Sequence, residues 1–167
     1  MKLSRVIATT ALLAGAMGSI TAMTDAGALP AHGPGGSAAR AHGHGSGIYL
    51  HPPFTGDRVS IELDASGSGG HFDVIHYDKL GKVFAHVSGT VNCLAVNGRM
   101  AVTTGTITSG FSPEIAGDPK GKSFAITVVD NDGGPDAVGV SYPLQQIPSC
   151  SAWPLNMVMD RGSYKIG

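Results

Sequence analysis

Charged and aromatic residues are scarce in this chain of 167 residues. Only 14% of the residues are charged, 6% are aromatic, and the formal net charge is −1. About a quarter of a typical soluble domain is charged, and long helices need far more Glu, Lys and Leu. The composition therefore excludes a coiled coil or a large helical domain. It also provides no basic face of the kind that binds nucleic acid, so we expect no nucleic-acid partner.

Familiar catalytic motifs are also missing. The sequence has only two glutamates, Glu62 and Glu114, and it contains no Gly-x-Ser-x-Gly elbow, no His-Glu-x-x-His zinc motif and no phosphate-binding loop. These absences favour a non-enzymatic protein. Asp, His and Ser residues are still numerous enough to form a site that no motif reveals, so a small secreted hydrolase stays an alternative.

The first 28 residues have the pattern of a signal peptide. Lys2 and Arg5 precede an apolar stretch from Val6 to Ile20, and the sequence Ala-Gly-Ala at residues 26–28 is typical of a cleavage site. The apolar stretch is shorter than the roughly twenty residues that a membrane-spanning helix needs; an uncleaved anchor is the alternative. We expect a secreted or cell-envelope protein, with no membrane span after cleavage.

The segment that follows is rich in glycine, proline and histidine. Residues 29–47 contain almost no large apolar side chains, so they cannot bury enough surface to offset the entropy that ordering costs. Ile48 and Tyr49 are the first candidates for contact with a folded body. We therefore expect a flexible tail over residues 29–56 and one folded domain over residues 57–167.

Apolar residues in this domain alternate with polar ones, which is typical of half-buried β-strands. Val59, Ile61 and Leu63 share one face of the first predicted strand. Nowhere after residue 56 do apolar residues recur convincingly at helical spacing. We expect an all-β, antiparallel domain of about seven or eight strands. A single β-barrel and a β-sandwich both remain open.

The clearest local signals lie in the middle of the domain. Residues 83–96 predict one long strand that bends or bulges at Gly89, because glycine inside a strand often marks such a bend. Asn97-Gly98 predicts a hairpin with a type I′ turn, whose two central positions both need positive φ. The strands on either side of this turn are therefore expected to pair.

Cys93 and Cys150 are the only cysteines. Neither lies in the Cys-x-x-Cys or Cys/His-rich spacing that is typical of redox and metal sites. Two cysteines in one small exported domain most simply pair with each other. Such a bridge closes a loop of almost sixty residues, so it is expected to stabilise the fold by roughly 3–4 kcal/mol.

Several stretches of the predicted β-domain carry a resemblance to known proteins. The most specific is the pattern Val-x-Cys-Leu-x-Val-x-Gly at residues 91–98. Over about residues 57–140 the chain resembles a group of small secreted actinobacterial proteins of uncharacterised function. The resemblance implies a secreted β-domain and brings no catalytic residues. The stretches that carry it are residues 70–74, 86–94, 96–101, 105–107, 128–131 and 135–136.

Histidines form two candidate metal sites. In the tail, His42 and His44 form a His-x-His pair of the kind that binds Cu or Zn; a solvated spacer is the alternative. His76 and His86 fall on adjacent predicted strands, and pairing through the turn near residues 79–82 places His76 opposite Ala85 or His86. In the second register the two imidazoles share one face, where they could bind a metal or form an ordinary polar cross-strand pair.

The loop at residues 130–136 is a candidate calcium site. It contains Asp130, Asp132 and Asp136, and Ca²⁺ takes about six to eight oxygen ligands. The loop lacks the glutamate that an EF-hand has at its twelfth position. Asp, Asn, Gly and Pro also form ordinary turns, so a plain turn is the alternative.

These observations favour a secreted, non-enzymatic β-domain that acts as a binding or interaction module for a small ligand or a protein. An extracellular metal-binding protein that uses the tail and strand histidines is the first alternative, and the small hydrolase is the second. The three differ in what they require. A binding module needs a cavity or an exposed apolar patch, a metal site needs convergent ligands, and a hydrolase needs titratable side chains that converge in a cleft.

Overall fold

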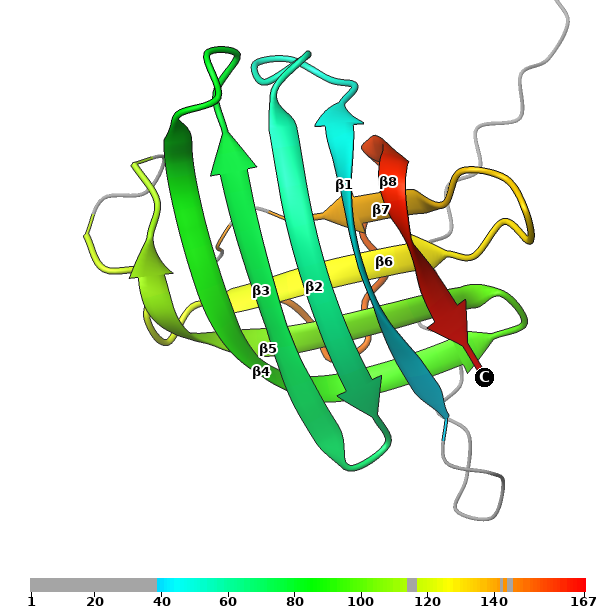
Figure 1. The fold of residues 1–167 in the computed structure, drawn as a ribbon. Helices are drawn as coiled ribbons and strands as arrows, with labels where there is room; N and C mark the ends of the chain where they lie inside the picture. The colour runs from blue at the N-terminus through cyan, green and yellow to red at the C-terminus, as the bar shows by residue number, and fades with distance from the viewer. Residues whose placement is uncertain (1–38, 114–116, 142, 144–145) are drawn as a thin grey trace, which may run out of the picture.

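Eight antiparallel β-strands close into a barrel (Figure 1). The structure is a computed structural model that describes residues 39–113, 117–141, 143 and 146–167. Each strand pairs with the next one along the chain, β8 pairs with β1, and the described residues contain no helix. The all-β antiparallel prediction is confirmed, and the architecture is a barrel. The strands are β1 (Arg40–Tyr49), β2 (Arg58–Ser66), β3 (Gly69–Tyr77), β4 (Val83–Asn97), β5 (Met100–Phe111), β6 (Ser123–Val129), β7 (Ala137–Val140) and β8 (Met157–Ile166).

The two ends of the barrel differ in their connections. We call the end with the longer connections the loop end, which carries the described residues 50–57, 78–82, 112–113, 117–122, 141, 143 and 146–156. The opposite turn end carries residues 67–68, 98–99 and 130–136. There Arg40 and Gly167 exchange two backbone hydrogen bonds of 2.6 and 3.0 Å. In Figure 1 the β1–β2 and β3–β4 connections lie at the top, and the C-terminus lies at the lower right.

The long strand β4 has the predicted bend. The register of its pairing with β5 shifts between Ser88 and Gly89, and a Cβ on Gly89 would lie 2.7 Å from the ring of Phe72. Glycine is therefore required there by close packing inside the barrel. The turn after β4 uses residues 98–99, and of these only Gly98 has positive φ, at 57°. The hairpin is confirmed, but its turn comes one residue later than predicted and is not type I′.

The flexible tail predicted over residues 29–56 is wrong for residues 40–49, which form β1 between β2 and β8. The folded domain therefore begins well before residue 57. In β1 the buried positions include Gly45 and Gly47, and a Cβ on either would lie 3.0 Å from the side chain of Met159. Met159 of β8 fills the core beside these two glycines, so the middle of β1 contributes no large side chain there. Residues 29–38 lie outside the described residues.

The β7–β8 connection covers part of the outer face of β5 and β6. The backbone N–H of Cys150 donates to Thr104 Oγ1 at 3.0 Å, and that of Trp153 donates to Thr127 Oγ1 at 2.7 Å. We call residues 150–154 the strap. Because the strap lies outside these two strands, outward-facing side chains there are as buried as inward-facing ones. They are Val102, Thr104, Ala125 and Thr127.

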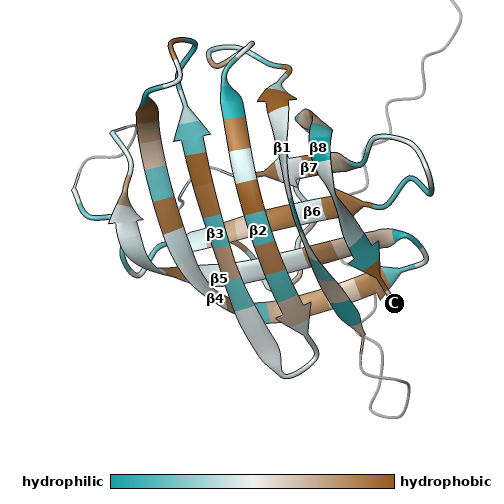
Figure 2. Cartoon of the chain, in the orientation of Figure 1, coloured by the Kyte–Doolittle hydropathy of each residue, from teal (hydrophilic) through white to brown (hydrophobic). Residues whose placement is uncertain are grey.

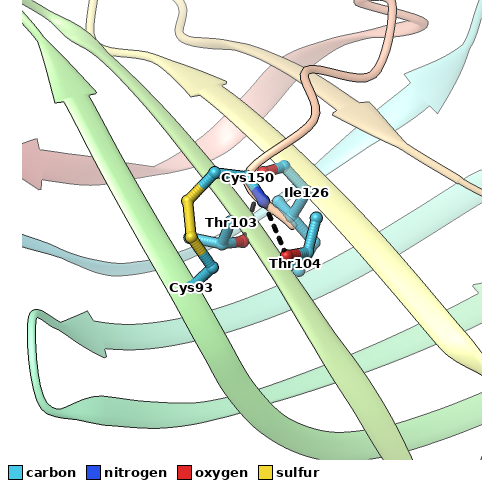
Figure 3. The surroundings of a disulfide bond; sticks show 5 residues. All are labelled: Cys93, Thr103, Thr104, Ile126 and Cys150. Carbon is cyan, nitrogen blue, oxygen red and sulfur yellow. Dashed lines mark hydrogen bonds between the residues drawn. A yellow bond between two sulfur atoms is a disulfide. The ribbon is translucent and has the colours of Figure 1, made fainter. Parts of the chain in front are cut away.

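A disulfide bond fastens the strap to the barrel (Figure 3). It joins Cys93 on β4 to Cys150, whose Cα atoms are 5.4 Å apart. Thr104, which pairs with Cys93 in the sheet, also accepts the hydrogen bond from Cys150. The predicted pairing of the two cysteines is confirmed, and its role is to hold a long connection against the outside of the sheet.

The seam between β7 and β8 depends on side chains. Only two residue pairs join these strands, Ala137 with Val158 and Val138 with Met157. Beyond them, the side-chain amide of Asn156 donates to the carbonyl oxygen of Val140 at 2.8 Å and accepts from its N–H at 3.1 Å. Asn156 thereby supplies the hydrogen bonds that a paired strand residue would provide.

Asp136 connects the same seam toward the turn end. Its carboxylate accepts from the backbone N–H of Tyr164 at 2.8 Å and from that of Asn131 at 3.1 Å. Its own carbonyl accepts from Met159 N–H at 2.8 Å. Asp136 is buried, so both carboxylate oxygens hold the β6–β7 loop and β8 together.

Tyr164 is the largest of the fully buried side chains in the described core. Its hydroxyl donates to the backbone carbonyl of Ile61 at 3.0 Å. Burial raises the pKa of the phenol, and the negative charge of Asp136 raises it further. The folded protein therefore holds the phenol proton at a pH where an exposed tyrosine has lost it.

We expect the free energy of unfolding to fall as the pH rises above about 10, the ordinary pKa of tyrosine. Above this pH the unfolded chain releases the Tyr164 proton and the folded chain keeps it, so stability falls by about 1.4 kcal/mol per pH unit until the folded pKa is reached. Tyr164→Phe should remove this contribution and cost about 1 kcal/mol at neutral pH, because Ile61 loses its donor. Urea unfolding from about pH 8 to about pH 11 measures both effects. Tyr77→Phe is the control, because Tyr77 is only half-buried. An unchanged slope in Tyr164→Phe would contradict the prediction.

Candidate functional site

A buried histidine–aspartate pair lies inside the barrel at the loop end. The side chains of His76, on β3, and Asp57, just before β2, are only 9% and 10% exposed. His76 Nε2 lies 2.9 Å from Asp57 Oδ2. His76 pairs with Val59 on one side and Ala85 on the other, and both are buried. The imidazole therefore lies on the inward face of the sheet.

Aromatic rings pack around this imidazole. The ring centroids of Phe54, Phe84 and Tyr49 lie 5.0, 5.1 and 5.6 Å from that of His76. Phe54 belongs to the β1–β2 connection, and its carbonyl accepts a 2.9 Å hydrogen bond from the backbone N–H of Asp57. The same short connection thus supplies both the carboxylate partner of His76 and one ring of its apolar surroundings.

A cavity of about 40 Å³ lies beside this pair. Its walls are mainly apolar, and the side chains come from six strands and from the β5–β6 and β7–β8 connections. Such a mixture of an apolar wall with a few polar groups is typical of small-ligand sites. The polar side chains are His76, Ser112 and Ser141, and the apolar wall includes Val59, Val74, Val87, Phe124 and Val140.

Two polar groups on the cavity wall, Nδ1 of His76 and the hydroxyl of Ser112, make no hydrogen bond to the described residues. Asp57 occupies Nε2 of His76, and Ser141 Oγ accepts from the backbone N–H of Ala125 at 2.9 Å. Within the described part of the chain, Nδ1 of His76 and the hydroxyl of Ser112 have no hydrogen-bond partner, although both residues are buried. Buried polar groups nearly always have a partner. These two groups are therefore the natural contacts for a polar atom of a ligand.

The predicted strand site of His76 with His86 is not formed. The register places His76 opposite Ala85, which is the first of the two predicted alternatives, and places His86 opposite Ile75. His86 lies on the outer face, where its Nε2 is 2.7 Å from Asp73 Oδ2. The two imidazoles are thus on opposite faces of the barrel wall, and each has its own carboxylate.

The tail histidines lie on the outside of β1. His42 and His44 are exposed and pair in the sheet with Asp64 and Glu62. Glu62 lies 3.7 Å from the imidazole of His71 on the next strand. The two histidines share one face of the strand, as alternate residues do. Because β1 pairs with β2 and β8, their backbone positions are fixed in the sheet.

The predicted calcium loop uses its carboxylates for internal contacts. Asp132 forms an ion pair with Arg99, and Asp130 Oδ1 accepts from the backbone N–H of Asp132 at 3.2 Å. Asp136 points into the β7–β8 seam. The described residues contain no group of three or more His, Cys, Asp or Glu that could hold a metal ion. The same part of the chain has no helix that is long and apolar enough to cross a membrane.

Asp57 and Ser112 were not among the candidate residues derived from the sequence. Asp57 could have been found from the sequence. It continues the every-second-residue pattern of Val59, Ile61 and Leu63 and so falls on the inward face of the strand. A carboxylate at an inward position of a strand needs a partner. Ser112 had no such signal, since it follows β5 in a Pro/Gly-rich loop.

Neither a protein-family model, nor a curated protein, nor a solved structure matches this chain significantly. What the cavity can do follows from its own residues, which are an apolar wall, an imidazole held by a carboxylate and a serine hydroxyl. This set fits a small ligand with one polar group. It also contains the types of side chain that hydrolases use.

Proposed function

We propose that this protein is an exported binding module that holds a small, mainly apolar ligand at the loop end of its barrel. The observation that carries the proposal is Nδ1 of His76, which lies on the wall of an apolar cavity and has no hydrogen-bond partner among the described residues. The aromatic rings and Asp57 fix the orientation of the imidazole before any ligand arrives. A preorganised polar group costs little entropy on binding, which favours recognition of one ligand group.

Three observations support export. Residues 1–28 have the pattern of a signal peptide. The disulfide between Cys93 and Cys150 suits an oxidising compartment, since disulfides are rare in the cytosol. The resemblance of residues 57–140 to small secreted actinobacterial proteins agrees with both.

The size of the cavity limits what enters it. A volume of about 40 Å³ is room for roughly two or three water molecules, so the part of a ligand that enters has about as many non-hydrogen atoms. When His76 Nε2 donates to Asp57, Nδ1 is an acceptor. The entering group is therefore a short apolar chain that ends in a hydroxyl or an amine, and the rest of the ligand lies at the loop end.

The test uses alcohols and amines of about two to four carbons and the matching alkanes as probes. We expect saturable NMR shifts of cavity residues such as Val59 and Phe124 with the polar probes, and weaker effects with the alkanes. His76→Gln should weaken binding of the polar probes about tenfold, because Gln can still donate to Asp57 but has no ring nitrogen that accepts at the position of Nδ1. His86→Gln is the matched control, since His86 also pairs with an aspartate but lies on the outer face.

If His76→Gln fails to fold, Ser112→Ala removes the second unused polar group and should weaken binding of the same probes. Shifts that never saturate, or that are equally affected by His86→Gln, would count against the cavity as the binding site.

A hydrolase is the second candidate, because the cavity wall carries a serine, Ser112, and a histidine, His76, that pairs with Asp57. In serine hydrolases the imidazole bonds to the serine hydroxyl, whereas no hydrogen bond joins His76 and Ser112 among the described residues. A ligand-binding function is therefore favoured over hydrolysis. Cleavage of p-nitrophenyl acetate that Ser112→Ala abolishes would reverse this order.

A further inference from the structure

Two histidines lie side by side on the outer face of β1. His42 and His44 occupy alternate positions of the strand, so their side chains leave the same face, about 7 Å apart along the chain. Both are exposed, whereas Ala41 and Gly45 beside them are buried. Within the residues that the structure describes, neither imidazole has a hydrogen-bond or ion-pair partner. Their ring nitrogens are therefore available to a ligand.

The backbone that carries these histidines is paired along both edges. β2 pairs with residues 40–48 of β1 on one side, and β8 pairs with residues 41–49 on the other. The pairing with β8 shifts register only between Ser46 and Gly47, beyond the two histidines. A His-x-His pair in a flexible chain loses conformational freedom when it closes on an ion, whereas the sheet has already fixed both backbone positions in β1. The barrel therefore preorganises the pair for binding.

The charges around the pair balance. Asp64 and Glu62 of β2 lie opposite the two histidines, and Figure 2 shows hydrophilic and hydrophobic colours alternating along that strand. Asp64 forms an ion pair with Arg40, and Lys165 of β8 lies beside His42. These two carboxylates and two cations cancel. An ion bound at this place is therefore held by the imidazole nitrogens and not by the charge of their neighbours.

We propose that His42 and His44 together bind one Cu(II) ion on the outside of the barrel. Imidazole is a good ligand for Cu(II), which takes a planar set of nitrogen and oxygen ligands and binds more tightly than the other divalent first-row metals. Two imidazoles on one strand face fill neighbouring positions of this set, and water fills the others. Zn(II) sites use three or four protein ligands, and the described residues bring no such group together. The pair lies outside the cavity, so this inference goes beyond the proposed function.

The test titrates the untagged, disulfide-bonded protein with Cu(II) and follows binding by calorimetry and electron paramagnetic resonance. We expect the tightest site to hold one ion per chain and to show the spectrum of two nitrogen ligands. His42→Gln and His44→Gln should each weaken this site about a hundredfold, because a single imidazole remains and the chelate is lost. Zn(II) should bind the unmodified protein at least about tenfold more weakly than Cu(II).

His71→Gln is the matched control, because it also removes an exposed histidine but lies on β3, two strands away, and it should leave Cu(II) binding unchanged. Urea unfolding without metal confirms that each variant keeps the barrel. With Cu(II) present, the urea midpoint of the unmodified protein should rise, because only the folded sheet holds the two imidazoles together. His42→Gln should abolish this rise. An equal loss of affinity in His71→Gln, a loss in only one of the two β1 variants, or an unchanged midpoint overturns the inference.

Discussion

Replacing Cys93 and Cys150 together by serine is expected to lower the free energy of unfolding by about 3–4 kcal/mol. The bridge spans a sequence separation of 57 residues, so the reduced chain gains considerable freedom when it unfolds. For a domain of this size the loss corresponds to a fall in Tm of roughly 10–15 °C. Thermal unfolding followed by circular dichroism measures it.

The structure adds a local consequence to this global one. Without the disulfide, the strap is held mainly by the hydrogen bonds of Cys150 with Thr104 and of Trp153 with Thr127. We expect hydrogen exchange to increase first in the strap and in the outer face of β6 beneath it. Reduction of the wild-type protein should reproduce the stability of the double variant. A loss below about 1 kcal/mol would contradict the structural role of the bridge.

Asp136→Ala is expected to destabilise the barrel by about 3 kcal/mol. The substitution leaves the backbone N–H groups of Tyr164 and Asn131 without their acceptor. A buried donor that loses its partner costs about 1–3 kcal/mol; the hydrogen bond of Tyr164 is buried and that of Asn131 is partly buried. The seam between β7 and β8 has few backbone pairs to compensate. Urea unfolding at neutral pH gives the difference directly.

Two further variants show whether the carboxylate itself is required. Asp136→Asn keeps the size but has one acceptor oxygen, so it should recover only part of the lost stability. Asp130→Ala removes the nearby carboxylate, which within the described part of the chain accepts only from Asp132 N–H, and it should change stability by less than about 0.5 kcal/mol. Equal effects of Asp136→Ala and Asp130→Ala would show that the seam does not depend on Asp136.

The strands that sequence reasoning found are those whose inward positions carry large apolar side chains. Val59, Ile61 and Leu63 alternate along β2, and all three are buried. β1 escaped the same reasoning because glycines occupy two of its buried positions, Gly45 and Gly47, and Met159 of β8 fills the space beside them. Burial in β1 is thus a property of its neighbour in space, which lies more than 100 residues away in the chain.

The candidate site likewise has one part that the sequence predicts and one part that it does not. The register that places His76 opposite Ala85 follows from the short β3–β4 turn, and it was one of the two predicted alternatives. The partner of His76 could not be derived in this way, because Asp57 reaches it from the far end of the β1–β2 connection. Carboxylates in the loop at residues 130–136 suggested calcium, and the structure instead uses Asp136 to complete the sheet. A local sequence pattern does not reveal that β8 passes beside this loop.

The pairing of β1 with β8 also determines the order in which the barrel can assemble. Seven of the eight strand pairings join neighbours along the chain, whereas the eighth brings Ala41 beside Ile166. Contacts this distant in sequence form slowly, and β8 is the last of the eight barrel strands to be made. Until it arrives, β1 and β7 are open edges with unpaired N–H and C=O groups, which invite pairing with other chains. The period before closure is therefore when a newly made chain is most exposed to aggregation, and a holding chaperone would be most useful then.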